Sequence, residues 1–235
     1  MYLIDLILNM QETHKKGNKI SEVILGGQDG LVSMLGLLLG LSAATSSTRI
    51  VIAGGLATVF AETISMTAVA YTSKMADRDH YHAEKKQEVR EMIEVSDSEK
   101  QEVRDIYSNK GFSGQLLDDI VDHITSDNKL WLNTMLRDEL DLLPVEKKDV
   151  YSFTVIVGLS TFSGAILPLV AFFFLPIHIA LVVAFIVSII VLAAVGYYKA
   201  VMTLGKPFKS ALQMVVIGIG AALVGYLIGH LFRAS

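Results

Sequence analysis

The stretch VILGGQDGLVSMLGLLLGLSAAT, residues 23–45, decides the fold class because it can cross a membrane as one helix. A spanning helix needs about 20 predominantly apolar residues, and the only charged residue in this stretch is Asp29. The whole chain shares this character, with 52% hydrophobic residues, 19% charged residues and a mean hydropathy of +0.49 over 235 residues. These values predict an integral membrane protein, because an average soluble domain is less apolar and more charged.

Four further stretches qualify as membrane spans, at about residues 50–71, 153–174, 177–198 and 212–232. A hydrophilic insert lies between the second and third spans. We therefore expect an all-α membrane protein with five transmembrane helices and a helical cytoplasmic insert. The expected divisions are an N-terminal amphipathic cytoplasmic segment (1–21), transmembrane helices 1 and 2 (22–71), the insert (72–150) and transmembrane helices 3 to 5 (151–235).

Lysine and arginine gather on one side of these spans, and the positive-inside rule makes that side cytoplasmic. The opposite side carries only Arg49 and Arg233. We therefore expect the N-terminus and the insert in the cytoplasm. The first residues have neither a positively charged start nor a small-residue cleavage site, so we expect no cleaved signal peptide. The short N-terminus favours a prokaryotic plasma membrane over a vacuolar-type organelle membrane.

The insert is strongly acidic. It holds 19 of the 24 acidic and 12 of the 20 basic residues, a formal charge of −7 compared with −4 for the whole chain. Its apolar periodicity predicts helices, with turn residues between them. We expect the second span to continue as a helix to about residue 95, and further helices over residues 97–107, 115–125 and 130–143.

Two acidic residues interrupt the first two spans. Asp29 and Glu62 would each cost roughly 2.5–3.5 kcal/mol at the centre of a spanning helix, so they are expected to face a bundle interior or a wet path. Glu22 lies two helical turns before Asp29, and Met66 lies one turn after Glu62. Together they would form a series of oxygen and sulfur ligands. The alternatives are an interhelical hydrogen bond for Asp29, helix-dipole compensation for Glu22 and plain packing for Met66.

The segment QEVREMIEVSDSEKQEV, residues 87–103, places two pairs of glutamates in the insert, Glu88/Glu91 and Glu99/Glu102. Glu84 shares a helix face with the first pair, and neighbouring lysines or a bound cation could offset the repulsion between these like charges. Spacing alone favours a solvated face over a metal site. For Glu99 it favours a capping box, SDSE at 96–99, with residues 96–98 as the bend between two helices.

Trp131, Met135 and Glu139 step by four along the last predicted helix of the insert. The ordinary explanation is that Trp131 and Met135 pack in a core. The alternative is a thioether beside a carboxylate, a ligand set that suits Fe²⁺ better than Mg²⁺ or Ca²⁺. His80, His82 and His123 lack a ligand-like spacing to these residues. Because the chain has no cysteine, any metal must be held by oxygen, imidazole or thioether.

Several familiar sites are missing from the sequence. It has no EF-hand loop, no Walker sequence and no HExxH, and it lacks the Glu-x-x-His element of di-iron bundles. We therefore expect no enzyme, no permanently bound cofactor and no nucleic-acid partner. Three GxxxG spacings, Gly26/Gly30, Gly36/Gly40 and Gly225/Gly229, predict close helix packing, either within the chain or between subunits.

From Glu22 onward the chain resembles the vacuolar iron transporter family. The segments that carry the resemblance are EVILGGQDGLVSMLGLLLGLS, GGLATVFAETISM, the glutamate-rich insert and WLNTMLRDEL. The resemblance implies a homodimer of five-helix protomers in the lipid membrane that exchanges cytosolic Fe²⁺, and often Mn²⁺, for protons; Zn²⁺ is a further candidate. It also implies that a cytoplasmic helical domain collects the metal.

The resemblance implies roles for individual residues. The family's pore aspartate, mouth acid and pore methionine fall on Asp29, Glu22 and Met66. Its metal-domain residues fall on Glu88, Glu91, Glu99, Glu102, Met135 and Glu139. With the resemblance, the two glutamate pairs become opposed walls of one metal site. One departure is Thr58, which stands where the family pattern has a glutamate, while the only acid of this span is Glu62, one turn later.

The sequence thus leads to one hypothesis and two rivals. The hypothesis is a divalent-metal/proton antiporter that removes Fe²⁺ or Mn²⁺ from the cytoplasm, with the insert gathering ions for the membrane acids. The first rival is a membrane-anchored metal sensor or buffer, which would have no use for Asp29 and Glu62. The second is a transporter of organic substrates, which would need an aromatic-lined path that the first two spans do not offer.

Overall fold

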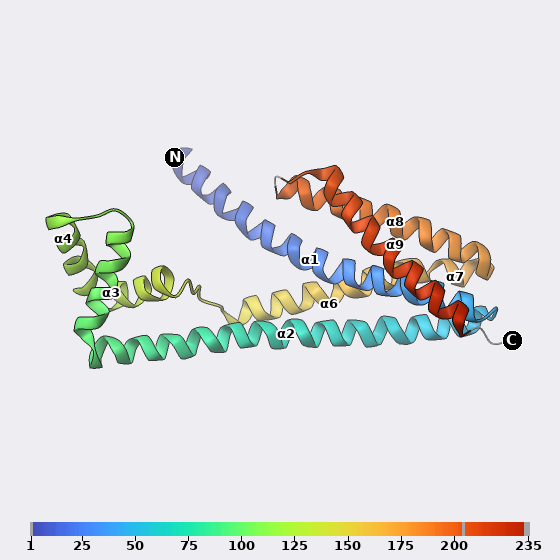
Figure 1. The fold of residues 1–235 in the computed structure, drawn as a ribbon, viewed down its shortest axis with the longest axis horizontal. Coiled ribbons are helices and arrows are strands. Elements are labelled where there is room, and N and C mark those ends of the chain that lie inside the picture. The colour runs from blue at the N-terminus through green and yellow to red at the C-terminus, as the bar shows by residue number, and fades with distance from the viewer. Residues whose placement is uncertain (1, 204, 233–235) are drawn as a thin grey trace. The chain divides into compact units, whose positions relative to one another are not determined.

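The computed structural model describes residues 2–203 and 205–232, and their side chains from residue 19 onward. Every regular element in this part of the chain is helical (Figure 1). In chain order the elements are α1 (Tyr2–Ala44), α2 (Thr48–Glu94), α3 (Ser96–Asn109), α4 (Gly114–Thr125), α5 (Asn128–Thr134), the π-helix η1 (Met135–Glu139), α6 (Lys147–Leu169), α7 (Ala171–Phe174), α8 (Ile177–Met202) and α9 (Pro207–Leu231).

The predicted fold class is confirmed. Five stretches are long and apolar enough to cross a membrane: Lys19–Ala44, Thr48–Glu94, Lys147–Phe174, Ile177–Met202 and Pro207–Leu231. The chain forms two compact units, which we call the membrane unit (Met1–Tyr71 with Tyr151–Ser235) and the insert (Thr72–Val150). Helical pieces fill the insert, as expected between the second and third spans.

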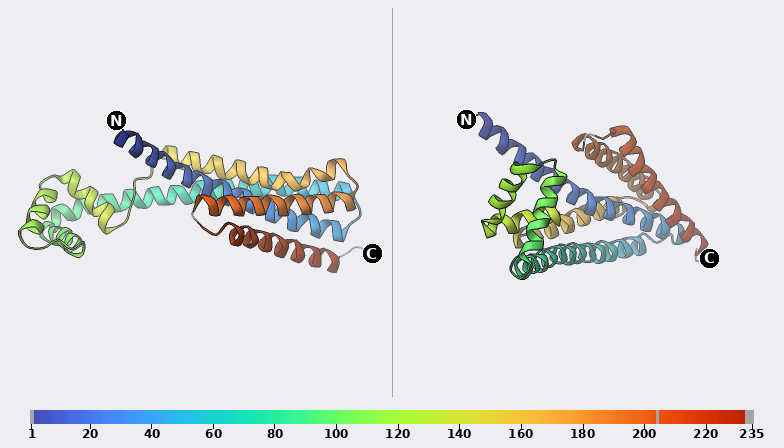
Figure 2. Two further views of the ribbon diagram at one scale, coloured as in Figure 1. Left: turned by 90° about the horizontal axis from the view of Figure 1, so that it is seen from above. Right: turned by 60° about the vertical axis from the view of Figure 1, so that its left-hand side comes forward.

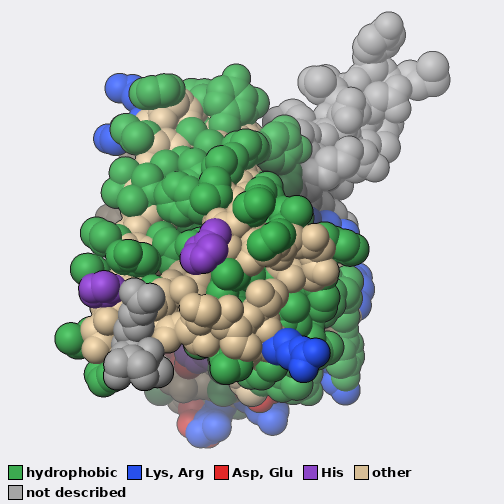
Figure 3. All heavy atoms as spheres, turned by 90° about the vertical axis from the view of Figure 1, so that its right-hand side faces the viewer, with side chains coloured by type: hydrophobic (Ala, Val, Ile, Leu, Met, Phe, Trp, Pro, Cys, Tyr) green, Lys and Arg blue, Asp and Glu red, His purple; other side chains and the backbone are tan. Residues whose placement is uncertain are grey.

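The membrane unit is apolar both inside and outside. Its largest core cluster includes Met34, Val59, Leu169 and Phe172, from α1, α2, α6 and α7. α8 and α9 lie side by side as a hairpin (Figure 2). Large hydrophobic side chains are also exposed on the surface, and Figure 3 shows them covering much of one face. An apolar outer surface suits contact with lipid and disfavours contact with water.

Glycines let α1 approach its neighbours closely. Gly36 and Gly40 of α1 face Gly225 and Gly229 of α9, and a Cβ on either α9 glycine would clash with the carbonyl oxygen of its partner. Cβ atoms on Gly26 and Gly30 would likewise meet backbone carbonyls of α6. All three GxxxG spacings are therefore used for packing within the chain, which is one of the two expected alternatives.

The insert has a core of its own, built on Val103, Leu117, Val121, Trp131 and Met135. The buried face of α4 matches the predicted helical periodicity except at its first leucine. In the sequence, five apolar residues of this helix recur at helical spacing and predict one apolar face: Leu116, Leu117, Ile120, Val121 and Ile124. Leu116 is nevertheless exposed, because it lies one residue out of step with Leu117 and Val121. Tyr107, Ile120 and Met92 close the core from α3, α4 and α2.

Two local predictions in the insert are wrong. The capping box does not form, because α3 begins at Ser96 with Val95 as its N-cap and no side-chain cap bond. The bend is therefore at Val95, and Glu99 turns inward with 4% of its surface exposed. The helix predicted over 130–143 begins earlier and ends earlier. Asp127 caps α5, accepting bonds from the amides of Lys129 (2.7 Å) and Leu130 (3.0 Å).

The early end of that helix has a physical cause. Asp141 adopts a left-handed backbone conformation with φ 50°, and the residue before Pro144 is disfavoured in the α region. The chain leaves helical geometry after η1 and re-enters it at Lys147. At the N-terminal end of the chain, α1 runs from Tyr2 into the first span, and the division at residue 21 stays a prediction. The amphipathic character expected of the N-terminal segment falls on residues whose side chains lie outside the described part.

Candidate metal pathway and carboxylate cluster

Three polar residues meet between α1 and α2 of the membrane unit. Asp29 and Glu62 are electrostatic neighbours, and the Ser33 hydroxyl donates a hydrogen bond to the Glu62 carboxylate. Ser33 lies one helical turn after Asp29, so both project from the same side of α1. The Oε2 atom of Glu62 is buried and has no hydrogen-bond partner among the described residues. A carboxylate oxygen left in this state is available to a proton or a cation.

These acids differ in how far the single chain covers them. Asp29 and Ser33 are exposed, and Glu22, Glu62 and Met66 are partly buried. Within one chain Asp29 is therefore uncovered and Glu62 is covered in part, and that these acids face a bundle interior or a wet path stays a prediction. Thr58, the residue that departs from the family pattern, is partly buried one turn before Glu62 on α2.

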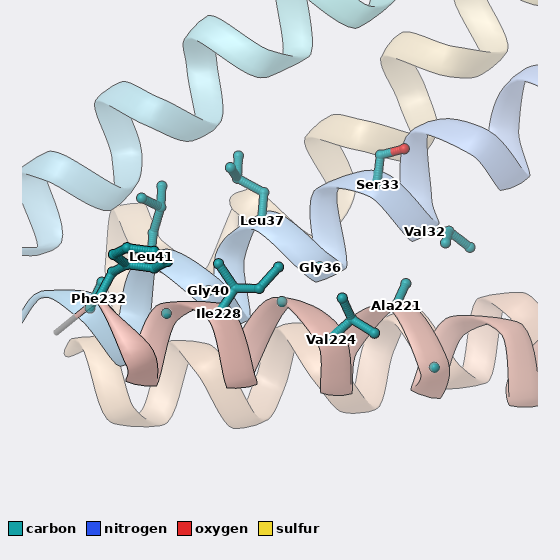
Figure 4. A pocket seen from close by; sticks show the side chains of 14 residues that line it. Val32, Ser33, Gly36, Leu37, Gly40, Leu41, Ala221, Val224, Ile228 and Phe232 are labelled. Carbon is teal, nitrogen blue, oxygen red and sulfur yellow. The ribbon is translucent and has the colours of Figure 1, made fainter.

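A groove of about 680 Å³ runs beside this site, between α1 and α9. It is lined by glycine, alanine and larger apolar residues, and Ser33 is the one polar side chain among the lining residues (Figure 4). The Ser33 hydroxyl points away from α9 in this view. A groove with such a lining offers no ligands to an ion, so we place the candidate ion path on the α2 side of α1 and not in the groove.

Five glutamates gather in the insert. Each acts electrostatically on others of the group, across the break at Val95 and across to η1. They are Glu88, Glu91, Glu99, Glu102 and Glu139, which we call the carboxylate cluster. The break at Val95 ends α2 and starts α3, and it leaves Glu99 and Glu102 of α3 within electrostatic reach of Glu88 on α2.

Burial and mutual repulsion make this cluster hard to ionise. Burial raises the pKa of Glu88 from 4.5 to about 7, and the charges of Glu99, Glu139, Glu91 and Glu102 add to the rise. Burial, then Glu102, Glu91 and Glu139, raise the pKa of Glu99 to about 7 as well. Glu139 is exposed, yet partial desolvation and the charges of Glu102 and Glu91 raise its pKa too. A cation would offset these costs directly.

Two oxygens of the cluster have no partner. The Oε2 atoms of Glu88 and Glu99 are buried without a hydrogen bond to any described residue, and the two side chains are only 5% and 4% exposed. Met135 is completely buried in the insert core. In the side chains from residue 19 onward, however, no three histidines or acids are arranged so that they could hold one metal ion. The carboxylates lie within electrostatic reach of one another, but no three of them surround one common position.

The remaining candidates lie apart from the cluster. Glu84 has His80 as its neighbour, with 3.6 Å between Nδ1 and Oε1. His82 and His123 are exposed. Sequence reasoning missed Ser33, although its position four residues after Asp29 was a usable signal. It also missed an ion pair between Lys110 and Asp138, next to Glu139, for which the sequence carries no signal.

Comparison with known proteins places this geometry in context. The sequence model of the VIT family matches residues 20–230. Vacuolar iron transporter 2 of Oryza sativa subsp. japonica is 33% identical over 89% of this chain and 86% of its own length. Vacuolar iron transporter 1 of Eucalyptus grandis is 32% identical over 89% of this chain and 85% of its own. The vacuolar iron transporter of Plasmodium falciparum is 31% identical over 92% and 83%.

Proposed function

The chain belongs to the VIT family, and on that premise we propose that it is an iron transporter that moves Fe²⁺ out of the cytoplasm in exchange for protons. The name carried by its relatives supports iron as the cargo. As a member of a transporter family it is not an enzyme. Mn²⁺ and Zn²⁺ are further candidate cargoes, since both accept oxygen ligands.

The observation that carries this proposal is the pair of buried, unpartnered carboxylate oxygens on Glu88 and Glu99. Two such groups destabilise a fold unless a proton or a cation compensates them. In this proposal Fe²⁺ is that cation, held by the carboxylate cluster with the Met135 thioether beside it. The cluster collects the ion on the cytoplasmic side, where the positive-inside rule puts the insert.

Asp29, Ser33 and Glu62 form the second part of the path, with Glu22 before them and Met66 after them along the helices. A carboxylate in a low-dielectric path holds either a proton or a share of a cation. Alternating access to Asp29 and Glu62 would therefore exchange one for the other. Because Glu62 replaces an acid expected at Thr58, the depth of the site and its ion selectivity are set by Glu62 in this chain.

We also propose a homodimer. Asp29 is exposed on the single chain, at a depth where an ionisable group facing lipid would cost roughly 2.5–3.5 kcal/mol on insertion scales. A second copy laid over α1 and α2 would cover these acids and enclose the path. The membrane would be a prokaryotic plasma membrane or a vacuolar-type membrane.

The alternative is a membrane-anchored iron sensor or buffer. Its support is that the insert is a compact unit with its own core, which is sufficient for binding without transport. The membrane acids discriminate between the two functions, because an anchor has no use for them.

Transport by proteoliposomes tests the proposal. Protein reconstituted with a proton gradient should take up Fe²⁺, and Asp29→Ala should abolish uptake while leaving Fe²⁺ binding to the insert intact. Uptake by Asp29→Ala at the wild-type rate would refute the assigned path. Binding without any uptake by the wild-type protein would support the sensor.

A further inference from the structure

The helical turn that follows α5 in the insert is a π-helix. η1 spans Met135–Glu139, and its i→i+5 geometry is seen in the bond from the Leu140 amide to the Met135 carbonyl, 3.1 Å. The next hydrogen bond spans six positions of sequence, from the Leu142 amide to the Leu136 carbonyl, 2.7 Å. Single π-turns are rare and are often found at functional sites. They persist only where surrounding contacts hold them.

One side of η1 is held by burial. Met135 and Leu136 are almost completely buried and anchor the turn to the insert core. Asp138 and Glu139 lie on the other side and are exposed. Glu139 faces the repulsion of the other carboxylates, chiefly Glu102 and Glu91. Repulsion alone would move its side chain away from the cluster, so a contact is needed that keeps this side of the turn in place.

Lys110 supplies such a contact. It is the C-cap of α3, and its ammonium group pairs with the Asp138 carboxylate. The same ammonium lies 4.6 Å from the centre of the Tyr107 ring, and Tyr107 packs against the insert core. The ion pair with Asp138 and the contact with the Tyr107 ring therefore both hold the Lys110 ammonium group in place. Through it, α3, which carries Glu99 and Glu102, is tied to η1 at the residue before Glu139.

We propose that the Lys110–Asp138 ion pair is a clamp that positions Glu139 in the carboxylate cluster and thereby sets the affinity of the insert for a divalent cation. Lys110 and Asp138 are positioning residues, and neither is a ligand. This inference rests on the proposed function, because it assumes that the cluster binds Fe²⁺.

The test must remove the pair without changing the local charge. Removing Lys110 alone would make the site more negative and attract cations, which would mask the loss of the clamp. The double variant Lys110→Gln/Asp138→Asn loses one charge of each sign and keeps the net charge. A matched control is Arg104→Gln/Asp118→Asn, which removes a 2.6 Å ion pair that joins α3 to α4 instead of η1.

The measurement is anaerobic titration of Fe²⁺ into the full-length protein by calorimetry. All variants carry Asp29→Asn and Glu62→Gln, so that the membrane acids contribute no heat. We expect Lys110→Gln/Asp138→Asn to weaken Fe²⁺ binding about two- to fivefold, the range of a partly exposed ion pair. The reversed pair Lys110→Asp/Asp138→Lys should restore most of the affinity, and the Arg104/Asp118 control should leave it unchanged.

Each other outcome overturns a specific claim. Unchanged binding in Lys110→Gln/Asp138→Asn, or an equal loss in the Arg104/Asp118 control, overturns the clamp. Failure of the reversed pair to restore binding also overturns it. Glu139→Gln separates this from the proposed function: if that variant binds Fe²⁺ as the wild type does, the cluster assignment itself is wrong.

Discussion

Glu88 on α2 and Glu99 on α3 are buried electrostatic neighbours across the break at Val95, and each has an unpartnered Oε2 atom. Their juxtaposition stores free energy in the metal-free insert, because both are desolvated and each, with a pKa of about 7, is partly ionised at neutral pH. Changing the pH, replacing one of the two side chains or adding a cation should therefore change the stability of the insert, and the direction of each change can be measured.

The stability of the metal-free insert should fall as the pH rises. The pKa of Glu88 and of Glu99 is about 7 in the folded chain and 4.5 ordinarily. The folded state therefore binds more protons than the unfolded state between these values, and the free energy of unfolding declines from about pH 5 to pH 8. Hydrogen exchange of α3 and α4, corrected for intrinsic rates, measures this decline.

Glu88→Gln should flatten that pH dependence and stabilise the metal-free insert at pH 8, because the amide needs no charge in a buried site. Glu94→Gln is the matched control, since Glu94 is exposed on the same helix. A pH profile identical in the two variants would contradict the assigned burial cost.

Glu99→Gln should weaken Fe²⁺ binding by at least tenfold while leaving helix α3 intact. The side chain makes no cap bond, so the amide removes a charge from the cluster without removing a helix contact. Calorimetric titration reports the affinity, and circular dichroism reports the helix. Unchanged Fe²⁺ binding would show that Glu99 is not part of the metal site.

Ser33→Ala should slow Fe²⁺ uptake several-fold, because the Glu62 carboxylate loses the hydroxyl that orients it. Ser33→Thr keeps the hydroxyl and should keep most of the rate. The informative readout is uptake by proteoliposomes as a function of Fe²⁺ concentration. Equal rates for the alanine and threonine variants would show that the hydroxyl does not act on Glu62.

Gly225→Ala should destabilise the membrane unit by roughly 1–3 kcal/mol, the usual cost of overpacking. Its new Cβ would clash with the Gly36 carbonyl, whereas a Cβ on Gly220, on the same helix, meets nothing within 4 Å. Thermal aggregation of the purified variants in detergent should separate them. Equal stability of Gly225→Ala and Gly220→Ala would contradict the α1–α9 packing.

The sequence predicts well what depends on composition and periodicity. Five spans follow from apolar length, and Leu117, Val121 and Ile124 follow from helical spacing. It predicts poorly what depends on a single backbone angle. The segment SDSE has the sequence of a capping box, in which Ser96 would be the N-cap. In the structure the N-cap is Val95, one residue earlier, so Ser96 lies inside α3. The Trp131–Met135–Glu139 spacing assumed an α-helix, and η1 departs from it.

The candidate site, like the fold, can be predicted from the sequence only in part. The letters alone suggest that Asp29 and Glu62 are unusual, because charge inside an apolar span is costly. They do not reveal that Ser33 bonds Glu62, or that Lys110 reaches Asp138 across 28 positions of sequence. Such pairings depend on how the helices are placed in space. Serine, lysine and aspartate are too common in sequences for any one of them to indicate such a contact.

Trp131 is the only tryptophan in the chain, and it is 4% exposed in the same small core as Met135. Its indole is therefore a native optical reporter inside the core of the insert. Fe²⁺ arriving beside Met135 should quench its emission, whereas an ion in the membrane unit should leave it unchanged. The protein thus allows filling of the insert to be timed separately from transport, with no label added.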